Sequence, residues 1–197
     1  MIGTKSCVRL TRARANLVVF ACALAIVGCG YAVLAIGPHL IYNSTPSLPR
    51  GWYWASPITG TIRRGALAFV CPPSPSLDQI RHTGQHFVPG NCPGGVAPFL
   101  KIVVGVPGDR VAVLPRGIEI NGRVLTHSKP VTALPLPRPT PTTVGAHEVW
   151  VWSPIAASVD SRYFGAAVPI AIGTPLGRIN DSDQRRLVPA FEGKRGE

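Results

Sequence analysis

The stretch FLKIVVGVPGDRVAVLPRGIEINGRVL, residues 99–125, decides the fold class of this sequence. It begins with an apolar run rich in β-branched residues, which only Lys101 interrupts. Further on, alternating runs flank a Pro-Arg-Gly break, and such alternation is typical of half-buried strands. Asn121-Gly122 is a strong signal for a two-residue hairpin turn. The stretch therefore predicts several short strands, with a β-hairpin among them.

The composition extends this prediction to the chain beyond the N-terminal region. Gly and Pro number 21 each among 197 residues, and so many helix breakers interrupt long helices. Strand-like runs recur at residues 60–70 and 148–154. Residues 72–98 and 128–143 are rich in turn-forming residues, and we expect surface loops there. Because no β-α-β alternation is visible, we predict a mainly β fold of antiparallel sheets.

An uncharged apolar segment, LVVFACALAIVGCGYAVLAI, occupies residues 17–36. A helix of this length can cross about 30 Å of hydrocarbon. Positive charge next to a membrane helix favours the cytoplasmic side. We therefore expect residues 1–16 in the cytoplasm and a periplasmic domain at residues 37–197, anchored in the inner (plasma) membrane of a bacterium. The basic residues before the segment are Lys5, Arg9, Arg12 and Arg14.

Two other interpretations of the apolar segment remain open. A cleaved signal peptide has a shorter apolar region and an Ala-x-Ala-like cleavage site, whereas this run is longer and no clean site follows it. Residues 26–29 resemble a lipoprotein cleavage box, but apolar sequence continues beyond Cys29. A retained anchor is therefore favoured. Cys22 and Cys29 then lie in the membrane and have no assigned chemistry.

The net charge of +11 does not indicate nucleic-acid binding. The basic residues are dispersed, and the sequence has no aromatic–basic RNA-binding motif. It also lacks the Cys/His spacing of zinc sites. The excess charge instead favours attraction to anionic lipid. We expect no metal ion, no cofactor and no nucleic-acid partner.

A second stretch, NSTPSLPRGWYW at residues 43–54, directly follows the apolar segment. Ser47 lies there between two prolines, which stiffen the backbone. One interpretation is a turn capped by aromatic core residues, and another is a loop that presents a nucleophile at the membrane surface. The aromatic residues after Gly51 fit either the membrane interface or the core.

Lys101 is the unusual residue of its apolar run. If the strand alternates, Phe99, Lys101 and Val103 share one face. A solvent-facing lysine on a half-buried strand is one interpretation. The other is an amine in an apolar pocket, where burial lowers the pKa and provides a neutral general base. The five histidines stand alone, without the context of a catalytic triad.

Three blocks, in this order, resemble the type I signal peptidases of the serine–lysine class, and within them the TraF-like enzymes of conjugative plasmids. The blocks are NSTPSLPRGWY at residues 43–53, LKIVVGVPGDRV at 100–111 and SVDSRYFG at 158–165. The resemblance extends over about residues 43–179. A weaker element, Arg64-Gly65, lacks the following Asp of the family pattern, and no role is assigned to it. The resemblance also implies a partly barrel-like arrangement of the sheets, preceded by one helix.

The resemblance implies roles for the residues of the first two blocks. Ser47 is the expected nucleophile, and Lys101 is the general base that takes its proton. The expected intermediate is a serine acyl-enzyme, which water hydrolyses. The backbone N–H of Ser47 and the hydroxyl of Thr45 are the expected donors to the oxyanion.

The third block is expected to support the lysine. Ser158 would hydrogen-bond the amine of Lys101, and Asp160 would pair with Arg162 to hold the block in place. An ordinary surface ion pair, worth about 0–1 kcal/mol, is the alternative for that pair. A direct influence of Asp160 on Lys101 stays open.

The resemblance thus implies a membrane-anchored serine endopeptidase that processes exported precursors, and conjugative pilin is the expected substrate. Too few residues separate Gly122 from Ser158 for the large inserted domain of many housekeeping enzymes. A general leader peptidase is the first alternative, and an inactive component of a secretion or mating channel is the second. The expected partners are a membrane-inserted precursor and the lipid bilayer.

Cys71 and Cys92 are the only cysteines of the predicted periplasmic part. Because that compartment is oxidising, they are expected to form a disulfide. This bond would close the Pro/Gly-rich segment between them.

Overall fold

The computed structural model describes residues 4–36, 39–131, 138–179 and 187–192. The chain divides into two compact units, residues 1–40 and residues 41–197. The first unit contains one long helix, α1 (Thr4–Ile36). Its Arg14–Leu34 part is long and apolar enough to cross a membrane, although a signal sequence near an N-terminus has the same properties. The helix begins earlier than the predicted apolar segment and includes the basic residues before it.

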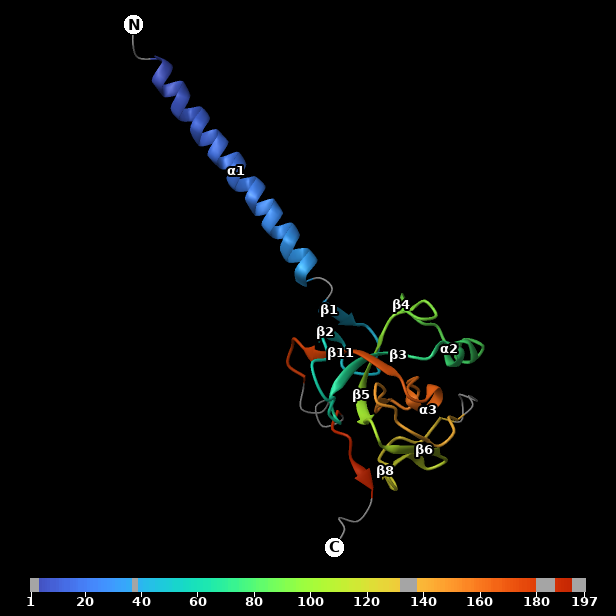
Figure 1. Cartoon of the computed structure of the whole chain (residues 1–197). Coiled ribbons are helices and arrows are strands. Elements are labelled where there is room, and N and C mark those ends of the chain that lie inside the picture. Colours follow the sequence, from blue (N-terminus) through green and yellow to red (C-terminus); the bar gives the residue numbers. More distant parts are fainter. Residues whose placement is uncertain (1–3, 37–38, 132–137, 180–186, 193–197) are drawn as a thin grey trace. The chain divides into compact units, whose positions relative to one another are not determined.

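The second unit is built on two antiparallel sheets (Figure 1). The larger sheet has the strand order β1-β2-β11-β3-β5-β10. Its strands are β1 (Leu40–Asn43), β2 (Gly51–Ser56), β3 (Leu67–Cys71), β5 (Phe99–Gly105), β10 (Trp150–Trp152) and β11 (Val168–Pro175). The mainly β, antiparallel fold class is therefore confirmed.

The smaller sheet has the strand order β12-β8-β7-β6-β9. Its strands are β6 (Arg110–Leu114), β7 (Gly117–Ile120), β8 (Arg123–Leu125), β9 (Thr142–Thr143) and β12 (Phe191–Glu192). Apolar side chains of both sheets share one core cluster, in which Ile102 of β5 and Ile118 of β7 are fully buried. The two sheets thus pack on one another, and burial of apolar area stabilises this packing.

The hairpin between β7 and β8 confirms the prediction made from Asn121-Gly122. Both residues have positive φ, 50° and 79° respectively, as a two-residue type I′ turn requires. The Asn121 side chain also accepts a hydrogen bond from the Arg110 N–H and donates one to Asp109. The turn thereby braces the start of β6.

Strands β3 and β10 pair with the two edges of β5, and a core cluster covers each of its faces. Strand β5 is therefore buried on both faces. Leu100 and Ile102 belong to the core shared with the smaller sheet, whereas Val103 belongs to a second cluster on the opposite face. Lys101 is odd-numbered, like Phe99 and Val103, and the period of two places it on that opposite face. Its exposed fraction is 5%, so the solvent-facing interpretation of Lys101 was wrong.

Three segments differ from the sequence-based expectation. In residues 60–70, only the end forms a strand, because a turn precedes it in which Ala66 N–H donates to the Arg63 carbonyl. The expected loop at residues 72–98 contains α2 (Ser74–Arg81) and β4 (Pro89–Cys92). Near the C-terminus, the sequence analysis predicted no strand, whereas β12 pairs with β8 in the structure. The elements in residues 72–98 and strand β12 pack against residues far away in the sequence. A local sequence pattern does not reveal such packing partners.

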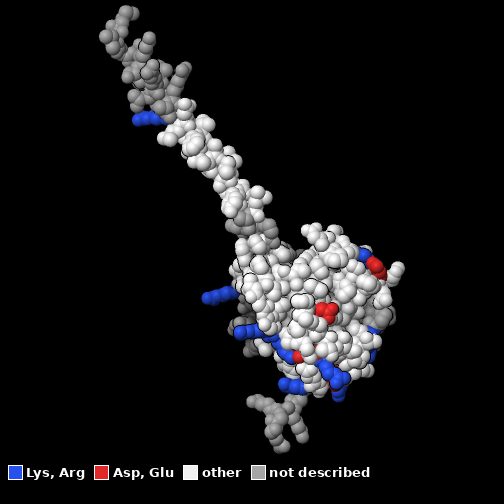
Figure 2. All heavy atoms as spheres, viewed as in Figure 1, with Lys and Arg blue, Asp and Glu red and all other residues white. Residues whose placement is uncertain are grey.

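Charged residues do not form one continuous basic patch on the face shown in Figure 2. Lys and Arg side chains lie mainly around the lower rim of the domain, towards the end that contains β8 in Figure 1. Most of the face between them is uncharged. This face offers no continuous basic surface for the phosphates of a nucleic acid.

Candidate active site

The loop after β1 is held in place by the buried side chain of Asn43. Its Nδ2 donates to the backbone carbonyls of Leu48 and Pro49, each at 3.1 Å, and to that of Thr45 at 3.2 Å. Its Oδ1 accepts from the Thr45 N–H at 3.2 Å and from the Thr45 hydroxyl at 2.8 Å. The Tyr53 hydroxyl also donates to the Pro49 carbonyl. These bonds fix the loop that presents Ser47.

The Ser47 hydroxyl lies 2.9 Å from the Thr45 hydroxyl. Thr45 has a single hydroxyl proton, and Asn43 Oδ1 can only accept. When Thr45 donates to Asn43, it is therefore the acceptor for the proton of Ser47. Ser47 is only 8% exposed, and the described residues offer its backbone N–H no hydrogen-bond acceptor.

The amine of Lys101 lies in a buried pocket on β5 and donates to the Ser158 hydroxyl at 2.7 Å. Burial lowers the pKa of Lys101 from its ordinary value of 10.5 to about 8. The Asp160 carboxylate opposes this decrease in pKa, and the Arg162 guanidinium adds to it. The Phe99 ring centroid lies 5.8 Å from the amine nitrogen. About one tenth of the amine is thus neutral at pH 7, whereas less than about a thousandth of an ordinary lysine would be.

Ser47 and Lys101 line the same cavity, of about 400 Å³. Thr45 and Ser158 also line it. Among the described residues, no hydrogen bond joins Ser47 to Lys101, because their side-chain bonds go to Thr45 and Ser158. The two groups therefore line one space without contacting each other through a hydrogen bond.

The third block is centred on a buried ion pair between Asp160 and Arg162. Both side chains are fully buried, so the surface-pair alternative was wrong. Arg162 binds the carboxylate at two points, with Nε to Oδ1 at 2.8 Å and Nη2 to Oδ2 at 2.7 Å. Asp160 also caps the short helix α3 (Ser161–Phe164) by accepting from the Arg162 N–H. Arg162 in turn donates to the carbonyls of Ile155 and Ser158.

Ser153 is a site residue that the sequence analysis missed. Its buried hydroxyl donates to the Ser47 carbonyl at 2.6 Å, and its N–H donates to Asp160 Oδ2 at 3.0 Å. Ser153 thus links the loop that carries Ser47 directly to the ion pair of the third block. The only signal in the sequence was a small polar residue near the end of the strand-like run at residues 148–154.

Arg64, to which no role was assigned, forms an ion pair with Asp109 of the second block. Asp109 also accepts from the N–H of Val106 and from the side chain of Asn121. Arg64 donates in addition to the Val104 carbonyl at 3.2 Å. These contacts brace the turn that follows β5, and they therefore support the strand that carries Lys101.

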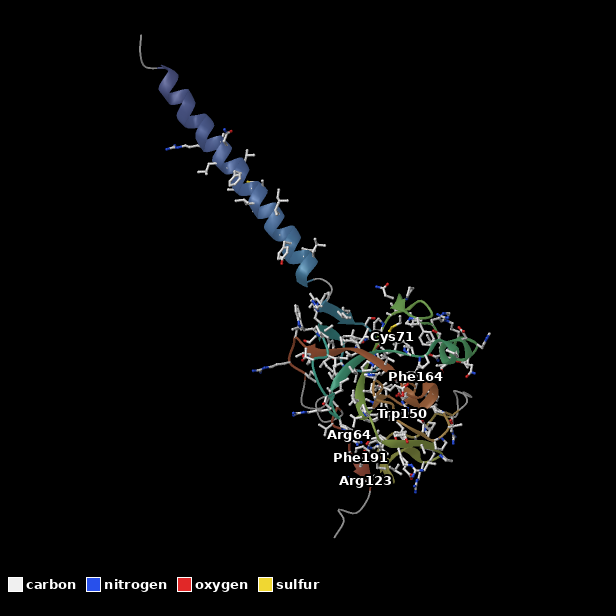
Figure 3. The ribbon with its side chains drawn as sticks, viewed as in Figure 1. Arg64, Cys71, Arg123, Trp150, Phe164 and Phe191 are labelled. Carbon is white, nitrogen blue, oxygen red and sulfur yellow. A yellow bond between two sulfur atoms is a disulfide. The ribbon has the colours of Figure 1, made fainter. Side chains whose placement is uncertain are left out.

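Cys71 and Cys92 form a disulfide in the structure, between the ends of β3 and β4. Its yellow sulfur–sulfur bond lies beside the Cys71 label in Figure 3. In the described part of the chain, Cys22 and Cys29 are free and exposed on α1. The described residues contain no group of three or more His, Cys, Asp or Glu side chains placed to hold a metal ion.

Comparison with known protein families defines the class to which this fold and site belong. The model of the signal peptidase family, peptidase S26, matches residues 11–179. The match extends over most of the chain and includes all three blocks, so the chain belongs to the signal peptidase family.

Individual relatives define the branch of that family. The chain is 33% identical over 150 residues to "Plasmid transfer protein TraF" of Escherichia coli, a match that covers 71% of this chain and 84% of the relative. It is 37% identical over 143 residues to "Probable conjugal transfer protein TraF" of Sinorhizobium fredii, with 68% and 72% covered. The resemblance to the TraF-like type I signal peptidases is thereby confirmed.

Proposed function

We propose that the chain is a membrane-anchored serine endopeptidase in which Ser47 is the nucleophile and Lys101 the general base. The observation that carries this proposal is a buried lysine with a pKa of about 8 on the cavity that Ser47 also lines. An ordinary surface lysine would be almost wholly protonated near neutral pH and unable to accept a proton. Membership of a peptidase family supports the same assignment.

The proposed reaction begins when the Ser47 hydroxyl turns from Thr45 towards the neutral amine of Lys101. Lys101 takes the proton as Ser47 Oγ attacks the scissile carbonyl, and it then passes that proton to the leaving amine. The product of this half-reaction is an ester between Ser47 and the substrate. Water, activated by the same amine, hydrolyses the ester and regenerates both side chains. Ser158 keeps the amine oriented throughout by accepting a hydrogen bond from one of its N–H groups.

The oxyanion of the tetrahedral intermediate needs two donors within hydrogen-bond distance. The N–H of Ser47 is one, because no described group occupies it. The Thr45 hydroxyl is the other, after its proton turns away from Asn43 Oδ1. The rigid loop positions the Ser47 N–H and the Thr45 oxygen before the substrate arrives, so rotation of the Thr45 hydroxyl is the main reorganisation needed.

The proposed substrate is an exported precursor protein that reaches the site from the membrane. Helix α1 would act as the anchor, with the N-terminus in the cytoplasm and residues 37–197 in the periplasm. The curated relatives are plasmid and conjugal transfer proteins by name, which favours a pilin precursor of a conjugative plasmid. A general leader peptidase that removes secretory signal peptides is the alternative, and an inactive channel component is the alternative from another class.

The test compares Ser47→Ala and Lys101→Ala with the parent in membranes that contain either a conjugative pilin precursor or a secretory preprotein. The parent is expected to cleave the pilin precursor, and each variant is expected to lose at least a thousandfold in rate, as with other coupled catalytic groups. The matched control is Thr59→Ala, which removes an exposed hydroxyl outside the cavity lining. Cleavage of the preprotein alone would favour the general leader peptidase. Retained cleavage in Ser47→Ala would refute the proposed nucleophile.

A further inference from the structure

The disulfide segment, residues 71–98, consists of the loop closed by Cys71–Cys92 and the six residues after it, and it forms one wall of the cavity that contains Ser47 and Lys101. Residues 85–88 and 97–98 of this segment line that cavity, together with the loop that carries Ser47 and residues 155 and 157–159. None of these wall residues belongs to the three blocks of the signal peptidase pattern. The sequence placed the segment on the surface, whereas the structure places part of it in the site.

The wall is fixed by several independent contacts. The disulfide joins Cys71 to Cys92 and closes the part of the segment that contains α2, and Leu77 of this helix is fully buried against Cys92 and Val96. The Ala97 N–H donates to the Val88 carbonyl at 2.7 Å and holds the two lining stretches together. The wall therefore has a defined position, although most of its residues are outside the main sheets.

The wall also reaches the environment of the general base. The Phe87 ring packs on the Phe99 ring, with 5.5 Å between their centroids. Phe99 in turn lies beside the Lys101 amine, with 5.8 Å from ring centroid to nitrogen. A continuous path of contacts thus runs from the disulfide segment through two aromatic rings to Lys101.

The chemistry of the wall indicates what it binds. The cavity is lined mainly by apolar side chains, and no carboxylate is among its lining residues. Val88 is 56% exposed although it is apolar, so it offers a contact to an incoming chain. Val88 and Ser47 line the same cavity. A polypeptide bound against Val88 would therefore extend to the peptide bond that Ser47 attacks.

We propose that the disulfide segment is a substrate-binding wall, which binds apolar side chains of the precursor polypeptide next to the scissile bond. This inference rests on the proposed function and adds a determinant of specificity to it. The disulfide maintains the wall, so oxidation of Cys71 and Cys92 is required for full affinity towards the precursor. Phe87 is a positioning residue in this arrangement, because it acts on Lys101 only through Phe99.

The test uses the full-length protein in lipid vesicles and two reactions. The first is cleavage of a pilin precursor, from which KM and kcat are obtained. The second is phosphonylation of Ser47 by a small fluorophosphonate, which needs the nucleophile and base but not the wall. Val88→Asp is compared with Val168→Asp, in which a similarly exposed valine of β11 lies outside the cavity lining.

Val88→Asp is expected to raise KM for the precursor about tenfold or more, since a charge replaces an apolar contact. Its phosphonylation rate is expected to stay within about threefold of the parent's, a change equivalent to less than 0.7 kcal/mol. Val168→Asp is expected to change neither quantity. The double variant Cys71→Ser/Cys92→Ser is also expected to raise KM for the precursor, as Val88→Asp does.

The two proposals fail in different ways. If KM is the same in Val88→Asp and the parent, the substrate-binding wall is refuted while the peptidase assignment stands. If Val168→Asp raises KM as much as Val88→Asp, the effect is one of surface charge, and the wall is again refuted. If the parent shows no phosphonylation of Ser47, the proposed function itself fails, and this inference fails with it.

Discussion

The state of a single amine, that of Lys101, governs both the proposed chemistry and the local stability of the fold. Its pKa in the folded protein is about 8, whereas an unfolded lysine has a pKa of about 10.4. The unfolded chain therefore binds the proton better than the folded protein does. At pH values below both pKa values, this difference lowers the free energy of unfolding. This destabilisation decreases as the pH rises from about 8 towards about 10.4, because the proton then leaves the unfolded chain too.

Lys101→Met is expected to unfold at the same temperature as the parent near pH 7, or at a higher one. The substitution replaces a desolvated amine by an apolar chain of similar length, and such replacements are often neutral or stabilising. The difference from the parent should shrink as the pH approaches about 10. Thermal unfolding at several pH values measures this. A clearly less stable variant near pH 7 would mean that the charged amine is a structural requirement.

Asp160→Asn is expected to destabilise the domain by about 3–5 kcal/mol, because it leaves the buried Arg162 charge without its partner. Asp78→Asn is the matched control, since Asp78 pairs with Arg81 on the surface, where such pairs contribute at most about 1 kcal/mol. Urea unfolding followed by Trp fluorescence measures both changes. Equal effects of the two substitutions would show that the buried pair has no special role in stability.

At the scale of elements, the sequence best predicted those helices, strands and turns whose conformation depends on residues close together in the chain. The hairpin at Asn121-Gly122 was predictable because its two residues favour the positive φ angles of that turn. The strand around Lys101 and the face that Lys101 occupies followed from the period of two. Alternation alone does not show what covers that face, and it therefore left open whether the amine was buried.

Long-range packing determined the elements that the sequence analysis missed. Helix α2 is short, and its stability depends on burying Leu77 against Cys92 and Val96 and on burying Ile80 in the second core cluster. Strand β12 forms because β8, far away in the sequence, offers a free edge. The link from Ser153 to the Ser47 carbonyl joins residues 106 positions apart. A local pattern contains no information about any of these partners.

Removing the disulfide is expected to destabilise the domain by about 3 kcal/mol, the loop-closure value for a ring of roughly this size. Cys71→Ser/Cys92→Ser is compared with Cys22→Ser, which removes an exposed free thiol of α1. All four Trp residues lie beyond residue 50, so Trp fluorescence during urea unfolding reports on the β-rich unit. An unchanged midpoint in the double variant, or free thiols at Cys71 and Cys92 in the oxidised parent, would contradict this expectation.

At the scale of the whole molecule, the proposal combines an apolar helix with a β-rich unit that acts on membrane-bound precursors. Protease added to spheroplasts is expected to degrade residues 37–197 and to leave a protected fragment that contains Arg14–Leu34. The intact mass of the purified protein should include α1, because the helix is retained as an anchor. Complete protection of the β-rich unit would reverse the orientation, and a mass without α1 would show that the helix is a cleaved signal.

The acylation rate of Ser47 as a function of pH tests the central claim, the Ser47–Lys101 dyad, most directly. The full-length parent and Lys101→Met are treated with the same acylating substrate between about pH 6 and pH 10, and mass spectrometry follows the Ser47 peptide. The account predicts that the parent's rate rises about tenfold per pH unit below about pH 8 and then levels off, as the amine becomes neutral. Lys101→Met should show almost no acylation at any pH. A rate that still rises about tenfold per pH unit up to about pH 10, as an amine with the ordinary pKa of about 10.4 would give, or equal rates in the two proteins, would contradict the assignment of Lys101 as the general base.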